Sequence, residues 1–426
     1  MSQNKQIRVL VVPSDRTGVS FFRSTAPHIA LETNYPDEFR VDIDYEPQLN
    51  NDAWLKQYDI IHYHRTLGAY EQMPDLINKI KNLGIVTIMD LDDHWSPGSH
   101  HPAYVIIKNA GLDKKILDNL RTAENITTTT EIFAKEIAKC NKNVYVLPNA
   151  IDPKEKQFTP NPEPSDRIRI GWLGGSSHLH DLKLLEGVVG KIKTDGLMDK
   201  VQFVLCGYDL RGSHTTIDEV TKQQTQRPIK PMESVWYLYE KIFTNNYTSI
   251  SPEYRDFLLK FKNEEYPNVK NEPYRRVWTQ PISTYASNYN LFDISLAPIE
   301  ENTFNKVKSQ LKVIESGFHK KALIAQNFGP YQIDLTNAVE FGGTINPNAN
   351  SILVDSAKNH KDWYKSIKKL VTNPELIKQL GDNLYNTVKD TYSMDSVTAK
   401  RRDLYKKLVS KKQKPILETE TVEKTN

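Results

Sequence analysis

The sequence lacks long hydrophobic runs and contains only two cysteines among its 426 residues. No segment approaches the roughly 18 consecutive apolar residues that a membrane-spanning helix needs. Cys140 and Cys206 lie far apart without the spacing of metal ligands, which argues against a disulfide framework and favours a reducing compartment. The first residues lead directly into an apolar run, so we expect a cytoplasmic protein without a signal peptide.

The chain also lacks a strong excess of charge of one sign. It has 56 basic and 53 acidic residues, for a net charge of +3, which does not favour a nucleic-acid-binding protein. A local exception is the basic segment Lys400–Lys414. This segment could contact the inner face of a membrane or a polyanionic acceptor, or it could be a solvated helix. The polar tail, residues 413–426, is predicted to be disordered.

A complete G-x-G-x-x-G motif is missing, but a strand, a glycine-containing loop and a helix follow one another twice. The two segments begin at Ile7 (IRVLVVPSDRTG) and Ile168 (IRIGWLGGSSHLHD). Strands and helices alternate in both halves, which predicts an α/β fold with two parallel sheets covered by helices. We expect Rossmann-like domains at 1–157 and 168–395, joined by a proline-rich linker at 158–167.

The segment 210–277 interrupts this alternation with a polar sequence rich in aromatic residues. A simple connection between a helix and a strand takes far fewer residues, so we interpret it as an insertion in the second domain. Its aromatic side chains could form an acceptor platform, an oligomer contact or the core of a small helical subdomain.

Four polar residues follow the expected strand ISLAPIEEN at helical spacing. Asn305, Lys308, Lys312 and Glu315 are separated by three, four and three positions, so a single helix would place them on one face. Lysines at a helix start suit phosphate groups, and Glu315 could accept hydrogen bonds from a ribose diol. The alternative is a solvated helix face on which Lys312 and Glu315 form a weak pair.

Several segments, taken in order, resemble one enzyme family. NVYVLPNAID resembles a strand leading into P-N-G-I-D, with Ala150 in place of the glycine. IRIGWLGGSSHLHD resembles the first strand and loop of a donor domain, and ISLAPIEENTFNKVKSQLKVIESGFHKKALIAQNFGP its donor-binding loop, helix and strand. Trp363–Ser393 resembles the closing helices. Together they resemble the GT-B glycosyltransferases of the group 1, or family 4, type.

This resemblance implies two Rossmann-like domains facing a central cleft, with a C-terminal helix at 396–412 crossing back to the first domain. It implies that a sugar moves from a nucleotide-sugar, UDP- or GDP-linked, to an acceptor hydroxyl, with retention and without a metal or other cofactor. A glycan, a lipid carrier, a protein hydroxyl and a modified nucleobase remain open as acceptors. The donor-binding candidates are Gly174, Gly175, Ser176, His178, Asn305, Lys308, Ser309, Lys312 and Glu315.

The sequence departs from the family motif of two glutamates separated by seven residues. Glu315 takes the second position, but Val307 occupies the first. Glu300 or Glu301 could substitute, or Asn305 and Lys308 could carry the sugar contact. Divergent members use N-x-x-K-S-x-x-K-x-x-E, which this sequence matches. The catalytic candidates are Asp92, Asp93, His94, His178 and Glu301.

On the acceptor side, the acidic segment Asp90–His94 ends a strand where such folds place ligands. Its acids could orient the acceptor hydroxyl or could simply form a helix cap and turn. Arg16, Gly18 and Arg23 are expected to face the cleft from the first loop and helix. The spacing of His94, His100 and His101 matches no usual ligand set, so we assign no metal.

Three alternatives remain at this point. Asp90 and Asp92 form a D-x-D pair that could hold a metal in a GT-A enzyme, although a second Rossmann-like start argues against that fold. A nucleotide-sugar 2-epimerase would share the GT-B fold and need no acceptor. A non-catalytic nucleotide-sugar-binding scaffold is suggested by Val307 at the position of the missing glutamate.

Overall fold

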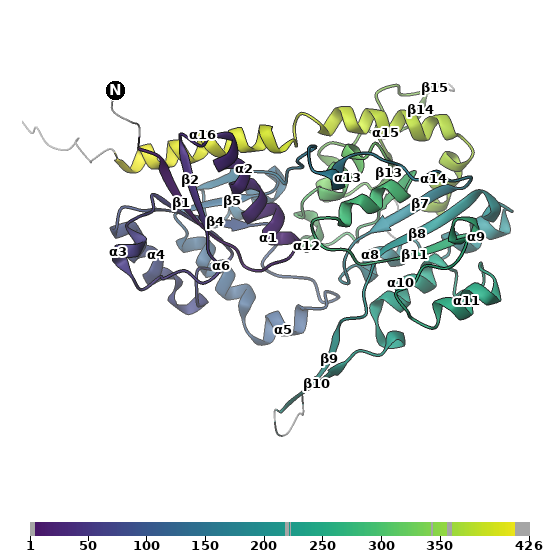
Figure 1. Ribbon diagram of the computed structural model, residues 1–426, viewed down its shortest axis with the longest axis horizontal. Coiled ribbons are helices and arrows are strands. Elements are labelled where there is room, and N and C mark those ends of the chain that lie inside the picture. Colours follow the sequence, from purple (N-terminus) through teal and green to yellow (C-terminus); the bar gives the residue numbers. More distant parts are fainter. Residues whose placement is uncertain (1–4, 218–220, 222, 342–343, 356–359, 414–426) are drawn as a thin grey trace, which may run out of the picture.

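A computed structural model describes residues 5–217, 221, 223–341, 344–355 and 360–413. These residues form two α/β domains that lie side by side (Figure 1). Each domain is built around a parallel six-stranded sheet. The predicted fold class, two Rossmann-like domains, is confirmed.

The first sheet has the strand order β2-β1-β3-β4-β5-β6. All six residues of β4, VTIMDL, are buried, as expected for a central parallel strand with helices on both faces. The strands are β1 (Ile7–Val12), β2 (Phe39–Ile43), β3 (Ile60–His64), β4 (Val86–Leu91), β5 (Asn125–Thr128) and β6 (Val144–Val146). The helices are α1 (Gly18–Ser20), continued by a π-helical turn (Phe21–Thr25), α2 (Ala26–Asn34), α3 (Asp52–Leu55), α4 (Met73–Asn82), α5 (Tyr104–Asn109), α6 (Leu112–Thr122) and α7 (Glu131–Ile137).

The second sheet has the order β11-β8-β7-β12-β13-β16. Its strands are β7 (Ile168–Leu173), β8 (Val201–Tyr208), β11 (Tyr274–Trp278), β12 (Ile294–Ala297), β13 (Ala322–Gln326) and β16 (Ile352–Val354). The helices are α8 (Leu179–Lys183), α9 (Val188–Thr194), α10 (Val235–Phe243), α11 (Pro252–Leu258), α12 (Thr303–Lys306), α13 (Leu311–Phe318), α14 (Lys361–Val371) and α15 (Pro374–Val388). A small two-stranded pair, β14 (Glu340–Phe341) and β15 (Thr344–Ile345), lies outside this sheet.

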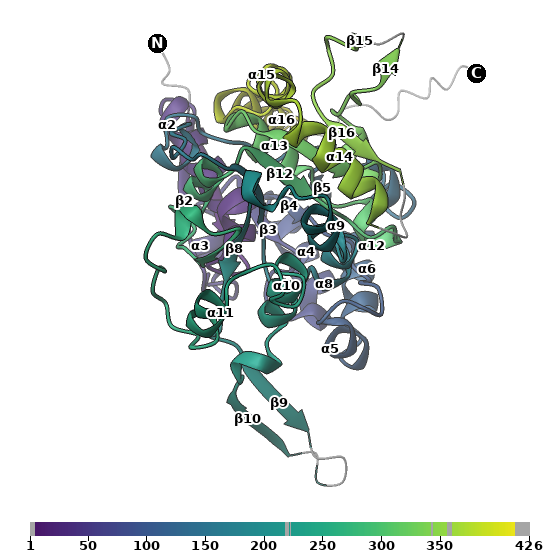
Figure 2. The same cartoon turned by 90° about the vertical axis from the view of Figure 1, so that its right-hand side faces the viewer.

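The aromatic segment 210–277 contains an antiparallel hairpin, β9 (Ser213–Ile217) and β10 (Gln224–Pro228), which projects away from both domains (Figure 2). Beyond the hairpin, the chain returns to the main fold. Trp236 and Tyr239 of α10 are buried in the same apolar cluster as Trp172 of β7, and β11 completes the sheet. The aromatic residues of segment 210–277 therefore contribute to the core of the second domain and do not form the core of a separate subdomain.

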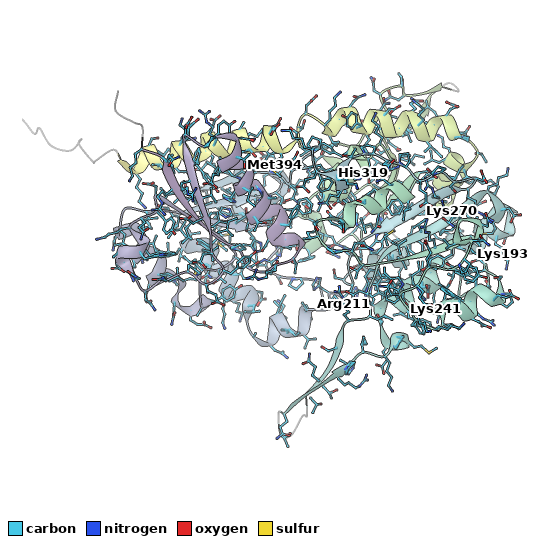
Figure 3. The ribbon with its side chains drawn as sticks, viewed as in Figure 1. Lys193, Arg211, Lys241, Lys270, His319 and Met394 are labelled. Carbon is cyan, nitrogen blue, oxygen red and sulfur yellow. The ribbon has the colours of Figure 1, made fainter. Side chains whose placement is uncertain are left out.

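The last helix, α16 (Met394–Gln413), returns from the second domain to the first. Figure 3 marks Met394 where α15 gives way to α16. Tyr405 and Leu408 of α16 lie in one apolar cluster with Val9 and Leu31 of the first domain, so the two domains share a core element. Gln413 ends this helix, and the rest of the predicted tail lies outside the described residues. No helix among the residues with assigned positions combines the length and apolarity needed to cross a bilayer.

Arg23 lies in the interior of the first domain rather than on the cleft where the sequence placed it. Its side chain is 1% exposed. It donates to both carboxylate oxygens of Asp90, at 2.9 and 2.7 Å, and to the carbonyl of Leu147 at 2.7 Å. A further bond, 3.0 Å long, reaches Asn149 in the loop after β6. Arg23 is therefore a buried cross-link between the first helical segment, β4 and the loop that leads to the linker.

Substituting Arg23 tests this structural role. We expect Arg23→Ala to lower the free energy of unfolding of the first domain by about 3–5 kcal/mol, because the Asp90 carboxylate is left buried and unpaired. Arg121→Ala removes an exposed arginine from the same domain and should cost about 1 kcal/mol or less. Urea unfolding followed by circular dichroism measures both variants. Equal losses would contradict the role assigned to Arg23.

Candidate functional site between the two domains

Loops from both sheets enclose a cavity of about 200 Å³ between the domains. Open α/β sheets bind ligands at the carboxyl ends of their strands, and the loops after β4, β7 and β12 meet here. A hollow of about 750 Å³ adjoins this cavity at the base of the hairpin, where Figure 3 labels Arg211. The lining of the smaller cavity includes Gly98, Ser99, His100, His101, Ser177, His180, Asp181, Glu300, Asn302, Phe304, Asn305 and Lys308.

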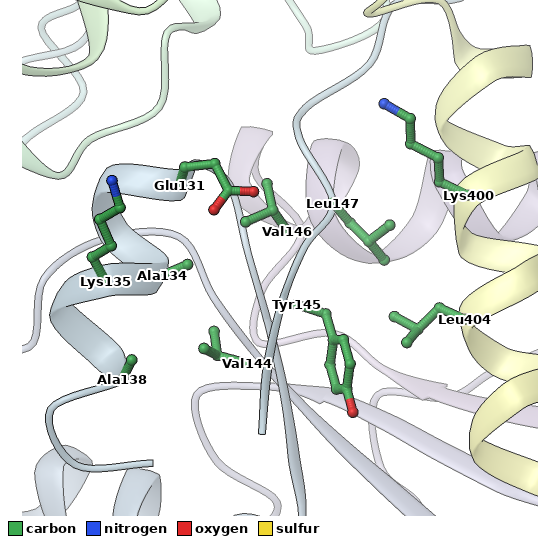
Figure 4. A pocket seen from close by; sticks show the side chains of 10 residues that line it. All are labelled: Glu131, Ala134, Lys135, Ala138, Val144, Tyr145, Val146, Leu147, Lys400 and Leu404. Carbon is green, nitrogen blue, oxygen red and sulfur yellow. The ribbon is translucent and has the colours of Figure 1, made fainter. Parts of the chain in front are cut away.

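A third hollow, of about 530 Å³, lies outside the interface, between α7, β6 and α16 (Figure 4). Its charged side chains are Glu131, Lys135 and Lys400, and the other lining side chains are mainly apolar. It includes none of the predicted site residues, so we place the candidate site in the interdomain cavity.

The segment expected to form one helix consists of two short helices, α12 and α13, separated by residues 307–310. The prediction of a single helical face therefore needs correction. Val307 is 2% exposed and belongs to the apolar cluster of the first domain that includes Met89 and Leu91. Burial of Val307 in the neighbouring domain explains the break, because a continuous helix would have to withdraw this side chain. Val307, which stands where the family motif has its first glutamate, therefore packs against the first domain.

Asn305 is buried and supports the loop rather than pointing into free space. Its side-chain amide donates to the carbonyl of Glu300 at 2.9 Å and to Asp181 at 3.2 Å. Asp181 in turn lies 2.7 Å from Nδ1 of His178. Burial and the nearby charge of Lys308 lower the pKa of His178 to about 4, so this imidazole is neutral at physiological pH.

Lys308 is the cation most available to the cavity. It is half-buried, and its Nζ lies 5.1 Å from the centre of the Phe304 ring. Within the described ranges no carboxylate lies at ion-pair distance from Lys308, although Asp93 and Asp181 are near enough to interact with its charge. An unpaired ammonium that lines a cavity is suited to bind an anion.

Lys312 and Glu315 do not form the solvated pair of the alternative interpretation. Lys312 donates to the carbonyl of Leu173 and lies over the Trp172 ring, and burial lowers its pKa to about 8. Glu315 is 4% exposed. Its carboxylate accepts hydrogen bonds from Tyr285 and, at 2.9 Å, from Tyr289. Burial raises the pKa of Glu315, and these hydroxyl donors and Lys312 oppose that shift.

The glycine loop after β7 leaves Gly175 and Ser176 exposed beside this segment. A side chain at Gly174 would approach Trp172 to 2.5 Å, so only glycine fits the loop in this position. Ser309 lies on the other side, where its hydroxyl accepts a 3.2 Å hydrogen bond from Asn149 of the first domain. Glu301 is exposed and accepts a 3.3 Å bond from Gln326 at the end of β13.

On the first domain, Asp92 lies in a polar network that the sequence did not predict. Its Oδ1 lies 2.9 Å from Nε2 of His64 and 3.2 Å from the guanidinium of Arg65. Although burial opposes it, the charges of His64 and Arg65 lower the pKa of Asp92. Arg65 adopts a φ of 61°, a strained conformation for this residue that is often found at functional sites. The sequence offered one sign of this network, the polar residues HYHR at positions 62–65, where β3 ends.

Asp93 differs from Asp92, because its side chain is 34% exposed. Its partial burial and the charge of Asp92 together raise its pKa. The preceding acid, Asp90, is fully buried and bonded to Arg23 and, at 2.6 Å, to Thr127. Asp90 and Asp92 therefore have separate partners, which argues against the D-x-D metal site of a GT-A enzyme.

The other first-domain candidates, His94, Arg16 and Gly18, are not among the residues that line the 200 Å³ cavity. His94 accepts a hydrogen bond from the Ser96 amide and stacks on Trp95, with ring centres 4.1 Å apart. Arg16 is exposed and lies over the Tyr45 ring. A side chain at Gly18 would approach Ile282 of the second domain to 3.4 Å, so this loop does face the other domain.

The three histidines considered from the sequence do not converge. His101 lies against Phe304, with ring centres 5.1 Å apart, and His94 lies with Trp95. His100 instead meets His180 and Glu300 of the second domain, and the potential ligand atoms of these three side chains lie within 4.8 Å of one another. The sequence could not reveal this group because its members come from three separate loops and helices.

No family model and no curated protein matches the sequence. Solved structures are similar to it along nearly the whole chain. A sucrose-phosphate synthase from Thermosynechococcus elongatus is 12% identical with a TM-score of 0.56, covering 96% of this chain and 100% of that one. Anabaena HepE in complex with UDP and glucose is 11% identical with a TM-score of 0.54, covering 95% and 100%.

The catalytic domain of starch synthase IV from Arabidopsis thaliana, bound to ADP and acarbose, is 10% identical with a TM-score of 0.56, and the match covers 95% of this chain and 100% of that one. These similarities, together with the two parallel sheets, identify the GT-B fold in this chain.

The pKa of Lys312 offers a direct test of this geometry. Carbon NMR of its Cε should show a midpoint near 8, because burial disfavours the charged form. Lys308→Met should raise that midpoint, since removing a nearby positive charge makes protonation of Lys312 easier. Lys306→Met, an exposed lysine two residues away, should leave it unchanged. If the midpoint of Lys312 in Lys308→Met is the same as in the unsubstituted protein, the two lysines are not close.

Proposed function

We propose that this protein is a glycosyltransferase that moves a sugar from a nucleotide-sugar to an acceptor hydroxyl, with retention and without a metal in the chemical step. The observation that carries the proposal is the ammonium of Lys308, which has no ion pair among the described residues and lines an interdomain cavity beside an exposed glycine loop. Among proteins with similar folds, HepE is described with UDP and starch synthase IV with ADP. A nucleoside diphosphate has the charge and the groups that this cavity can bind.

The second domain would hold the donor. Lys308 would offset the charge that develops on the departing diphosphate, and the amides of Gly175 and Ser176 would approach its oxygens closely. Lys312, which lies deeper, would favour the same anion through its charge below a pH of about 8. Glu315 would accept bonds from the ribose hydroxyls, in exchange for one of its two tyrosine partners.

The first domain would hold the acceptor. Asp93 is the more exposed of the two acids at the end of β4, so it would orient the acceptor hydroxyl, while Asp92 is held by His64 and Arg65. The raised pKa of Asp93 makes it a better proton acceptor than an ordinary carboxylate. His178, which is neutral, could donate a hydrogen bond to the donor sugar or phosphate without adding charge.

A thermal-shift screen of nucleotide-sugars followed by turnover assays tests the proposed function. The correct donor should raise the melting temperature by mass action, and the sugar should then be transferred to an acceptor. Formation of an epimer without any acceptor would instead identify a 2-epimerase. Donor binding without turnover across glycan, lipid, protein and nucleobase acceptors would favour the scaffold. If no nucleotide-sugar stabilises the protein, the result contradicts the transferase, the epimerase and the scaffold alike.

The role of Glu315 can be separated from that of the phosphate-binding groups. Glu315→Gln keeps the shape of the side chain but removes its charge, so it should weaken binding of the preferred nucleoside diphosphate by about 1–3 kcal/mol. Pyrophosphate lacks ribose, and its affinity should remain unchanged. Isothermal titration calorimetry measures both ligands. Equal losses for the two would contradict a ribose contact and indicate an indirect effect on the phosphate site.

A further inference from the structure

His100, His180 and Glu300 form a polar group at the boundary of the two domains. His100 comes from the first-domain loop before α5, His180 from α8, and Glu300 from the loop after β12. Nδ1 of His100 lies 3.4 Å from Oε1 of Glu300. The two imidazole rings are nearly parallel, at 12°, with centres 4.1 Å apart.

We propose that these three side chains bind one divalent transition metal, of the zinc class, and thereby link the two domains. Two imidazoles and one carboxylate are a ligand set that suits zinc, and magnesium or calcium prefers oxygen ligands. In a tetrahedral site with bonds of about 2.1 Å, ligand atoms lie about 3.4 Å apart. The ligand atoms here lie within 4.8 Å of one another, so binding one ion requires both imidazoles to turn out of their stacked arrangement until their nitrogens face the same point.

Of the two second-domain ligands, Glu300 is held in place by hydrogen bonds. The backbone amide of Glu300 donates to Asp181 on α8 at 2.7 Å, which joins the loop of Glu300 to the helix of His180. The other carboxylate oxygen of Glu300 accepts a 3.1 Å bond from Asn302. Such outer contacts orient ligands and strengthen metal sites. The second domain therefore supplies two of the three ligands, with Glu300 already held in place, and His100 supplies the third from the first domain.

The location gives the site a consequence for the protein. His100 and His180 line both the 200 Å³ cavity and the adjoining 750 Å³ hollow, so a bound ion would lie in the wall between them. An ion held by ligands from both domains stabilises the arrangement in which those ligands meet. This role concerns domain closure, and it does not depend on which nucleotide or acceptor the cleft binds.

Cobalt binding tests the proposal without any activity assay. Untagged protein is dialysed against a chelator and then titrated with Co²⁺, whose visible absorption reports tetrahedral coordination by nitrogen and oxygen. We expect one Co²⁺ per chain, displaced by one Zn²⁺ and not by Mg²⁺. His100→Ala, His180→Ala and Glu300→Gln should each weaken binding at least tenfold. His214→Ala removes an exposed histidine of the hairpin and should have no effect.

Each other outcome overturns part or all of the proposal. Unchanged affinity in the His180 and Glu300 variants would show that the metal binds elsewhere, and absence of any stoichiometric site would leave only a stacked imidazole pair beside a carboxylate. Loss of binding in the His180 variant but not in the His100 variant would confine the site to the second domain and exclude the link. Melting temperatures in chelator establish that every variant is folded.

Discussion

The buried ion pair between Arg23 and Asp90 is the constraint on which the rest of the site depends. Two charges removed from water must be paired with good geometry, and here both carboxylate oxygens are bonded to the guanidinium. The same guanidinium holds Asn149, whose amide reaches Ser309 in the second domain. The pair therefore fixes the end of β4, where Asp92 and Asp93 emerge, and connects it through one further residue to the proposed donor loop.

Burial distinguishes the charged residues around the cavity from one another. Lys312 and Glu315 are enclosed by Trp172, Tyr285 and Tyr289, so their protonation depends on the protein interior. Lys308 is only half-buried and lines the cavity, and it has no ion pair in the part of the chain that the structure describes. Two lysines of the same motif thus have different environments, because the break in the helix places one at the cavity and the other against β7.

The alternation of strands and helices, with two glycine-containing loops that each follow a strand, was sufficient to predict two parallel sheets. It failed at α12 and α13, where helical spacing suggested one continuous face. Val307 is apolar, and its burial in the other domain outweighs the few hydrogen bonds that a continuous helix would add. Arg23 was misplaced for a related reason, since a charged residue near a glycine loop is usually exposed and its buried partner, Asp90, is distant in sequence.

The sequence by itself determined the α/β architecture, the strand ends that carry polar residues and the position of Lys308 shortly after β12. These features arise from local patterns of apolar and polar residues, which mark where strands and helices begin and end. Tertiary structure decided which polar residues are buried, which meet across the domains and which remain free. Arg23 with Asp90, Glu315 with its tyrosines, and His100 with His180 and Glu300 are pairings between distant segments. Their geometry is set only when the two sheets and α16 pack together, because no local interaction specifies it.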